Sequence, residues 1–306
     1  MEYLGMDIGF GDVKAVLVNR KLETLKAISF PTLVAGYTPA PLEKDKTVLC
    51  FGGKKYVVGQ DARGEPGCFQ LSDFDDMKEF APLLFRKVLQ TDGFEGNEIA
   101  VCAGMPPGWW PQRGEVANAL RAEMQSVVVV PQGQGAFVAV QEEKDLEGVE
   151  TVLILDFGYN TVDYLLMEIT GYGEFEIIKG NTLPRLGVTK LVKLFRGELK
   201  GELSELPDRA LKEMLRAGQG KLYGENINLS GHKRRAVEKY CAMLMGELKS
   251  NVGETWRETD AVICTGGGVY YFEPQRNLPH HRIVIPEEPE FANARGQGIW
   301  IAKSAR

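Results

Sequence analysis

The strongest constraint on the fold is an internal repeat that relates the start of the chain to its middle. Residues 4–18 (LGMDIGFGDVKAVLV) align without a gap with residues 153–167 (LILDFGYNTVDYLLM). Identical residues coincide at Asp7/Asp156, Gly9/Gly158, Val13/Val162 and Leu17/Leu166. Each copy has an apolar stretch, an Asp-x-Gly turn and a second apolar stretch, which predicts a β-hairpin with glycine in its turn. The repeat predicts two related halves with a cleft between them, and the alternative is a coincidence between two glycine-containing turns.

The remaining segments alternate between strand and helix patterns. A third strand is predicted after each hairpin, at 24–30 and 175–179. Helical periodicity predicts helices over 75–90, 112–125, 188–196, 206–217, 230–252 and 291–303, and apolar runs predict strands over 98–102, 127–130, 261–264 and 282–285. Ser230 is expected to be the N-cap of its helix, and the proline-rich residues 31–42 are expected to form a loop. The alternation indicates an α/β protein.

The composition is that of an ordinary globular protein. Of its 306 residues, 44% are hydrophobic and 25% are charged. This length is enough for about two domains. No apolar run approaches the roughly 18 residues of a membrane span, and residues 1–10 lack the features of a secretory signal. We therefore expect a cytoplasmic protein without a membrane partner.

The cysteines and the net charge argue against disulfide-rich, zinc-binding and nucleic-acid-binding proteins. Five scattered cysteines without a CxxC pair favour reduced thiols over a disulfide framework or a zinc site. A net charge of -6 offers no general attraction for a nucleic-acid backbone, so no direct nucleic-acid binding is expected.

The glycine-rich turns of both hairpins present groups that can bind phosphate. Residues 9–12 and 158–161 offer consecutive backbone N–H groups. Asp7 and Asp156 end the strands just before these turns, where carboxylates could hold the waters of a bound Mg²⁺. Lys14, in the returning strand, can add a positive charge. One Asp-x-Gly turn is usually only a turn, but the pair together with the lysine favours a polyphosphate site.

A third glycine-rich segment follows the apolar strand at 261–264. Gly266, Gly267 and Gly268 would let a flat ligand such as a nucleoside approach the backbone, although they could equally form a flexible connector. The chain lacks a GxxxxGK[ST] run, and neither Gly9-x-Gly11 nor Gly133-x-Gly135 is followed by a third glycine at dinucleotide spacing. Walker-type and Rossmann-type binding are therefore disfavoured.

These motifs resemble those of the actin-like ATPase superfamily. Residues 7–14 (DIGFGDVK) resemble its first phosphate motif, residues 156–163 (DFGYNTVD) the second, and residues 263–268 (ICTGGG) the adenosine motif. Residues 131–136 (PQGQGA) are similar to the first connecting motif and residues 291–296 (FANARG) to the segment near the second. The order matches that of the superfamily. Together with the Met105-Pro106 loop, the PQG and FANARG segments look most like prokaryotic ParM/StbA-type plasmid-segregation actins and their archaeal relatives.

The resemblance implies an actin-like fold with two related lobes. Each lobe would contain a mixed five-stranded sheet flanked by helices, with the nucleotide in the cleft between the lobes. Lobe I would span residues 1–150, with a small subdomain at about 30–75 and the C-terminal helix, 289–306, packing back on it. Lobe II would span residues 151–288, with a small subdomain at about 190–250.

The resemblance also implies roles for individual residues. Asp7 and Asp156 would bind Mg²⁺ through water, and Gln132 would orient the attacking water with help from Asp156. The phosphates would be held by Gly9, Phe10, Gly11, Asp12, Lys14, Gly158, Tyr159, Asn160 and Thr161. The nucleoside would be lined by Gly187, Gly266, Gly267 and Gly268. The acidic Asp12 departs from the small or polar residue that the family often carries, which leaves the orientation of its side chain open.

The residues that would contact adenine have no clear match. The charged residues of the predicted helix at 230–252 are candidates: Lys233, Arg234, Arg235, Glu238 and Lys239. A solvated charged helix face is the favoured interpretation of these residues. Tyr271 could flank the base, although a tyrosine in the core is the favoured interpretation.

The activity implied by the resemblance is that of an actin-like ATPase. It would bind Mg-ATP, with GTP as an alternative nucleotide, polymerise into filaments and hydrolyse the nucleotide. Through a DNA-bound adaptor protein it would segregate a plasmid or other DNA, or serve another cytoskeletal role. One alternative is a small-molecule kinase of the same superfamily, which would need a substrate-facing catalytic Asp or a Cys-rich zinc motif. The other alternative is a nucleotide-gated adaptor that forms no filament.

Overall fold

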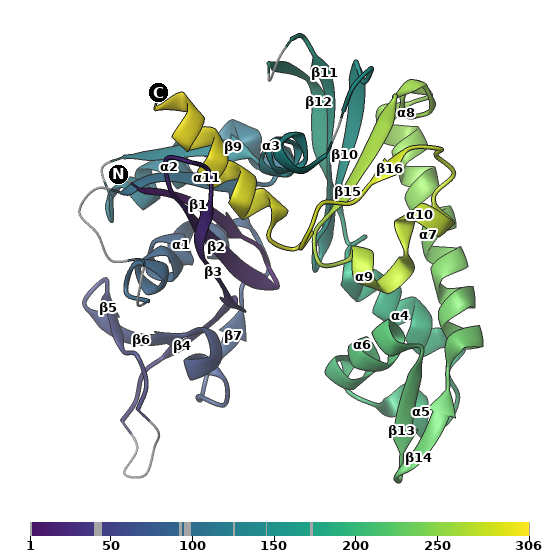
Figure 1. Cartoon of the computed structure of the whole chain (residues 1–306). Coiled ribbons are helices and arrows are strands. Elements are labelled where there is room, and N and C mark those ends of the chain that lie inside the picture. The colour runs from purple at the N-terminus through teal and green to yellow at the C-terminus, as the bar shows by residue number, and fades with distance from the viewer. Residues whose placement is uncertain are drawn as a thin grey trace. The chain divides into compact units, whose positions relative to one another are not determined.

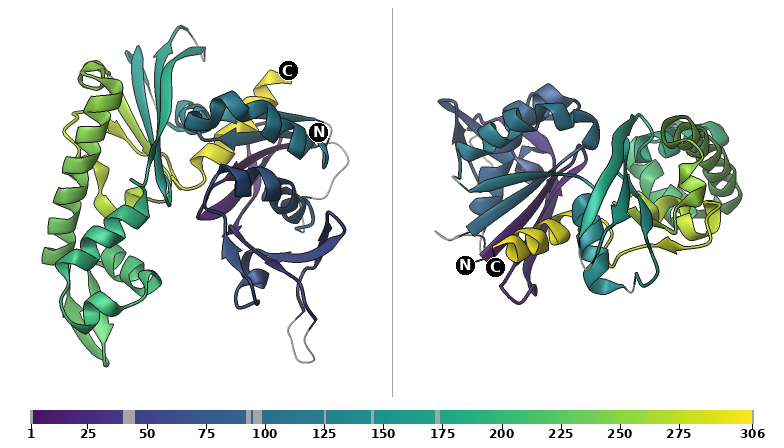
Figure 2. Two further views of the ribbon diagram at one scale, coloured as in Figure 1. Left: turned by 180° about the vertical axis from the view of Figure 1, so that it is seen from behind. Right: turned by 90° about the horizontal axis from the view of Figure 1, so that it is seen from above.

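The computed structural model of the chain describes residues 2–39, 45–91, 94, 99–124, 126–144, 146–171 and 174–305. They form two units, shown in Figure 1. Unit 1 combines Met1–Lys144 with Glu290–Arg306, and unit 2 spans Asp145–Pro289. The C-terminal helix, drawn in yellow, therefore lies in the same unit as the N-terminal strands, and both chain ends belong to unit 1 (Figure 2).

Unit 1 is built on a mixed sheet. Within the described residues the sheet has five strands in the order β3-β2-β1-β8-β9. Their bounds are β1 Glu2–Ile8, β2 Asp12–Val18, β3 Thr24–Pro31, β8 Ile99–Met105 and β9 Val127–Pro131. The first three strands pair antiparallel, whereas β8 lies parallel to β1 and β9 parallel to β8. Because helices cover both faces, nearly every residue of β1 is buried, which explains its continuous apolar sequence.

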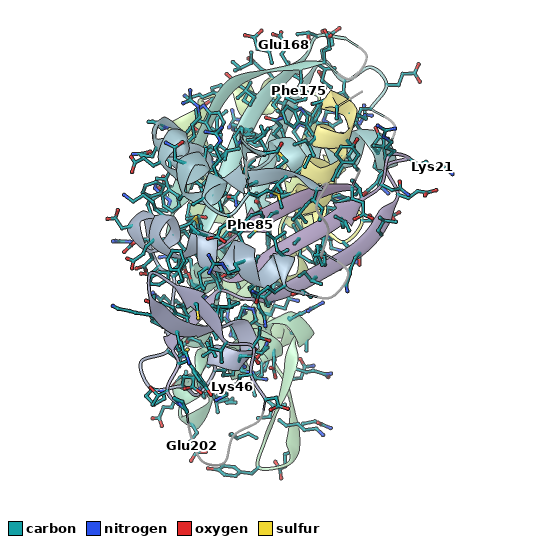
Figure 3. The ribbon with its side chains drawn as sticks, turned by 90° about the vertical axis from the view of Figure 1, so that its left-hand side faces the viewer. Lys21, Lys46, Phe85, Glu168, Phe175 and Glu202 are labelled. Atoms are coloured by element: carbon teal, nitrogen blue, oxygen red, sulfur yellow. The ribbon has the colours of Figure 1, made fainter. Side chains whose placement is uncertain are left out.

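Four helices pack on this sheet: α1 (Phe74–Leu89), α2 (Arg113–Arg121), α3 (Gln134–Glu143) and α11 (Ala292–Ser304). Leu4 and Met6 share a core with α1, and Phe85 of that helix, labelled in Figure 3, is fully buried in this core. Gly5 points to the opposite face, where a Cβ atom would collide with the carbonyl group of Ala294 on α11. The close approach of α11 to β1 therefore depends on that glycine.

A small sheet extends unit 1. It has four strands among the described residues, in the order β5-β6-β4-β7, with bounds β4 Leu33–Gly36, β5 Leu49–Phe51, β6 Lys54–Val58 and β7 Phe69–Gln70. The short helix η1 covers Gly59–Ala62. The prediction of a loop over 31–42 was wrong where β4 forms, and residues 40–42 lie outside the described residues. Strand β4 pairs with β6 and β7, partners that its local sequence does not reveal.

Unit 2 repeats the sheet arrangement of unit 1. Its five described strands follow the order β12-β11-β10-β15-β16, with bounds β10 Thr151–Phe157, β11 Thr161–Ile169, β12 Phe175–Pro184, β15 Ala261–Thr265 and β16 Ile283–Val284. Again the first three strands are antiparallel, and the last two join in parallel. The same strand order in both units matches the repeat seen in the sequence.

The other elements of unit 2 are helices and one hairpin. The helices are α4 Val188–Glu198, α5 Glu202–Glu205, α6 Asp208–Ala217, α7 Ser230–Val252, α8 Thr255–Glu258, α9 Val269–Phe272 and α10 Pro274–Asn277. Strands β13 (Gln219–Leu222) and β14 (Glu225–Asn228) form the hairpin. The expectation that Ser230 is the N-cap of α7 was wrong. Ser230 is the first helical residue, and its hydroxyl donates to the Gly218 carbonyl at 3.3 Å.

In the part of the chain that the structure describes, no helix has the length and hydrophobicity that crossing a bilayer requires.

Candidate functional site

The loop between β1 and β2, Gly9 to Gly11, has all three of its carbonyl groups held by the chain around it. The Thr32 hydroxyl donates to the Gly9 carbonyl at 2.6 Å, and the Thr32 amide donates to the Gly11 carbonyl at 3.1 Å. The Gln70 side-chain amide donates to the Phe10 carbonyl at 2.6 Å. Thr32 is fully buried just before β4 and Gln70 ends β7, so the small sheet fixes the backbone of the loop.

This anchoring determines where the N–H groups of the first loop point. In a planar trans peptide the N–H group of each residue points opposite to the preceding carbonyl group. The N–H groups of residues 10, 11 and 12 therefore point away from Thr32 and Gln70. Successive N–H groups on one side of a turn form a concave site for an anion.

The loop between β10 and β11 in unit 2 is anchored in the same sense by the start of α4. The three hydrogen bonds run from Val188 N to Gly158 O at 3.0 Å, from Thr189 N to Tyr159 O at 3.0 Å and from Gly187 N to Asn160 O at 3.1 Å. The N–H groups of residues 159, 160 and 161 consequently point away from α4.

Gly187 is needed for this packing. A Cβ atom there would collide with the Tyr159 carbonyl and lie 2.7 Å from the carbonyl carbon of Asn160. The structure thus explains Gly187 by its contact with the loop. Its predicted contact with a nucleoside stays a prediction.

Three of the predicted residues of unit 1 lie together beside the first loop. Asp7, near the end of β1, is the register partner of Lys14 on β2. The Gln132 side-chain amide donates a hydrogen bond to Asp7 Oδ1, and both side chains are buried. Burial raises the pKa of Asp7 above its ordinary value, whereas the charge of Lys14 and the hydrogen bond from Gln132 act in the opposite direction. Asp12 contributes its backbone carbonyl, which accepts from Gly9 N at 3.1 Å.

The corresponding position in unit 2 carries a different charge pattern. Asp156, near the end of β10, is buried, and its register partner is the buried Asp163. Asp163 accepts hydrogen bonds from the hydroxyl groups of Thr161 and Thr182. The lysine of the first hairpin is thus replaced by a hydrogen-bonded carboxylate in the second.

The three glycines after β15 pack against the end of β10. Gly266 has a φ of +82°, and a Cβ atom there would collide with Asp156 Oδ1. Gly268 N donates to the Phe157 carbonyl at 2.9 Å. Gly267 lies between them and is half-buried. The left-handed backbone and the close contact together require glycine at 266, and they bring this segment next to Asp156 and the second loop.

One cation beside the second loop was missed by the sequence analysis. Lys212 of α6 lies over the ring of Tyr159, with Nζ 4.9 Å from the ring centroid. On the same helix, Arg216 lies over the ring of Tyr270 at 4.7 Å. Lys212 belongs to an amphipathic helix with many charges, so nothing in the sequence distinguishes it.

Four of the five charged candidates on α7 form ion pairs, and the fifth, Lys233, donates to the Arg216 carbonyl at 3.1 Å. Arg235 and Lys239 bind Glu198 of α4, and Arg234 pairs with Glu238. These contacts agree with the favoured interpretation of a solvated face.

The acidic side chains beside the two loops are single aspartates and form no cluster within the described residues. Within the described ranges, no group of three or more His, Cys, Asp or Glu side chains could hold a metal ion. Each unit instead offers an aspartate beside a loop that presents amides, Asp7 in unit 1 and Asp156 in unit 2. Mg²⁺ commonly keeps several waters and uses one or two carboxylates together with phosphate oxygens.

Both units match models of actin-like protein families. Residues 5–142 match the model for the N-terminal domain of actin-like proteins. Residues 154–276 match the C-terminal model of the archaeal actin homologue MreB-like. No curated protein matches the sequence significantly.

Solved actin homologues share the fold over nearly the whole chain. Ta0583, an archaeal actin homologue, matches with a TM-score of 0.80 and 17% identity over 100% of both chains. The 15-stranded ParM filament from Clostridium botulinum gives a TM-score of 0.75 and 18% identity over 99% of both chains. ParM from Bacillus thuringiensis with ATP gives 0.66 and 16% identity over 100% of both chains.

These matches confirm the predicted actin-like fold, with mixed sheets flanked by helices, and the resemblance to ParM and archaeal actins. The first unit thus matches a model of actin-like proteins, the second matches a model of an archaeal actin homologue, and the whole chain has the actin-like fold.

Proposed function

We propose that this protein is an ATPase that binds Mg-ATP through its two glycine loops and couples hydrolysis to self-assembly into filaments. The observation that carries the proposal is the shared anchoring of the loops. In each loop three successive carbonyl groups are held on one side, which directs three successive N–H groups to the other. Two such sites suit the phosphate oxygens of one nucleotide.

The residues beside the loops would divide the chemistry between them. Mg²⁺ would be held through water by Asp7 and Asp156, and it would neutralise the phosphate charge. Lys14 would add a positive charge beside the first loop. Gln132, whose amide donates to Asp7 in this structure, would orient the attacking water through its side-chain oxygen. Asp156 would assist in polarising this water, and Gly266, Gly267 and Gly268 would contact the nucleoside.

Relatives with the same fold support nucleotide use and assembly. Structures have been solved of Ta0583 with ADP and of Bacillus thuringiensis ParM with ATP, and ParM from Clostridium botulinum forms a filament. A head-to-tail contact that does not close on itself generates an open filament. We propose that this chain forms such filaments in the cytoplasm and moves plasmid or other DNA through a DNA-bound adaptor. GTP is a second nucleotide to test.

The proposal is tested by phosphate release and sedimentation of the purified chain with Mg-ATP, without any added phosphate acceptor. Wild type is expected to release phosphate and to pellet only when nucleotide is present. Asp156→Ala should lower kcat by about 100-fold, because charge stabilisation acts in the transition state. Gln132→Ala should slow turnover and leave ATP binding nearly intact, because orientation of water matters mainly during reaction.

The matched control is Asp75→Ala, which removes an exposed carboxylate from α1. It should behave like wild type. Hydrolysis that depends on an added small-molecule acceptor would instead indicate a kinase. Hydrolysis without pelleting at high protein concentration would contradict the filament, and wild-type turnover in both site variants would contradict the site.

A further inference from the structure

Gln297, on α11, is a buried polar residue with no hydrogen-bond partner in the described structure. Its side chain is fully buried, and neither its amide nitrogen nor its amide oxygen has a partner among the described residues. Leaving such a group unpaired inside a protein is unfavourable, and native proteins rarely retain one without a reason. An apolar side chain of similar length would fill the same space without this penalty.

The unpaired amide lies next to the side chain of Gln132. Both approach Gly104 on β8, which is the register partner of Asp7. A Cβ atom at Gly104 would collide with Gln297 Nε2 and would lie 3.2 Å from Gln132 Cγ. No side chain of residue 104 therefore separates the two glutamines.

The stem of Gln297 is fixed by the elements on either side of it. A Cβ atom at Gly135 on α3 would lie 3.0 Å from Gln297 Cγ, so the stem is held close to α3. Its terminal amide, by contrast, reaches β8 beside Gln132. The side chain thus passes from the helix that follows Gln132 to the strand beside Asp7.

The same face of α11 also holds the backbone next to Gln132. Asn293 Oδ1 accepts hydrogen bonds from Gly133 N at 2.8 Å and from Ala136 N at 3.2 Å. Asn293 and Gln297 are four residues apart and share one face of the helix. The helix therefore holds the backbone after Gln132 with one side chain and places an unpaired amide beside the Gln132 side chain with the other.

We infer that Gln297 is a positioning residue for Gln132, an inference that rests on the proposed ATPase function. Here the Gln132 amide is engaged by Asp7. When Asp7 takes part in nucleotide binding, the Gln132 carboxamide needs another hydrogen-bond partner that holds it toward the attacking water. Gln297 supplies that partner, and its amide is kept unpaired for this exchange.

The test is Gln297→Met, which keeps the length of the side chain and removes its amide. Because no hydrogen bond is lost, the melting temperature without nucleotide should rise. The kcat for ATP hydrolysis should fall by about 10- to 100-fold with KM unchanged, because Gln132 would be misplaced in the transition state. If Gln297 were only structural, its replacement would change the melting temperature and leave kcat unchanged.

A double-mutant cycle tests whether Gln297 acts through Gln132. In the Gln132→Ala background, Gln297→Met should have no further effect on kcat, since residues that act as a unit are not additive. The matched control is Gln112→Met in η2 (Pro107–Gln112), which removes another buried amide oxygen without a partner among the described residues. It should raise the melting temperature and leave kcat unchanged.

Each contrary outcome has a separate meaning. A lower melting temperature of Gln297→Met, wild-type kcat in that variant, or additive effects with Gln132→Ala would overturn the role of Gln297 while leaving the ATPase intact. Absence of hydrolysis by the folded wild type would overturn the proposed function itself, and this inference with it.

Discussion

The two glycine loops reach the same backbone arrangement by different means. In the first loop two of the three carbonyl groups accept from side chains, Thr32 Oγ1 and Gln70 Nε2. In the second loop all three accept from backbone N–H groups at the start of α4. The middle residues differ as well, since Phe10 packs edge-on against Trp109 at 5.4 Å whereas Tyr159 lies under Lys212.

Different parts of the chain can therefore alter each loop. The first loop is tied to the small sheet of unit 1, so a movement of β4 or β7 would shift its N–H groups. The second loop is held by backbone N–H groups at the start of α4, and these donors remain when a side chain is shortened. The first loop should therefore be sensitive to loss of a side chain, and the second to insertion of one.

The largest effect is expected from Gly187→Ala in the second loop. The new Cβ atom would collide with the Tyr159 carbonyl, and backbone atoms on both sides leave little room for relaxation. We expect a loss of about 3 kcal/mol in the free energy of unfolding. Displacement of two amides from the phosphates, at about 1.5 kcal/mol each, would weaken ATP affinity by about 100-fold. Denaturant unfolding and nucleotide titration measure the two effects.

The control for this change lies on the same helix. A Cβ atom at Gly197 of α4 would meet nothing within 4 Å. Gly197→Ala should therefore stabilise the chain by about 0.5–1 kcal/mol and leave ATP binding unchanged. Equal behaviour of the two variants would show that the contact between Gly187 and the loop is unimportant.

A smaller effect is expected from Thr32→Val in the first loop. The change keeps the side-chain shape and removes the hydroxyl that holds the partly buried Gly9 carbonyl. An unsatisfied carbonyl group should lower the free energy of unfolding by about 1–3 kcal/mol. The Thr32 amide still binds Gly11, so we expect only about a ten-fold loss of ATP affinity, or about 1.4 kcal/mol. Thr32→Ser retains the hydroxyl and should bind ATP like wild type in the same titration.

The smallest effect concerns Asp7, which faces a lysine where Asp156 faces a carboxylate. Burial raises the pKa of Asp7 above 3.8, so the Asp7 carboxylate binds a proton more readily in the folded chain than in the unfolded chain. The resulting stabilisation is fully present below pH 3.8 and is lost as the pH rises through the raised pKa. Asp7→Asn should therefore increase the free energy of unfolding at pH 7, measured by denaturant unfolding. A gain at pH 7 that persists unchanged below pH 3.8 would contradict this explanation.

Local patterns in the sequence predicted most of the large elements. The helix expected at 75–90 forms as Phe74–Leu89, and that expected at 230–252 forms with these bounds. Helix α3 was missed because seven of its ten residues are buried, which leaves no polar face to mark it. The small sheet and the β13-β14 hairpin were missed because their strands are short and their pairing partners supply much of their stability.

The two hairpins, with their glycine turns and terminal aspartates, can be predicted from the sequence alone, because strand alternation and glycine turns are local properties. The groups that hold those turns in place come from distant parts of the chain and depend on the folded structure. Thr32, Gln70 and Gln132 lie 23, 60 and 125 residues from the groups they bind. Contacts over such separations arise from the packing of whole elements, and no local pattern records them.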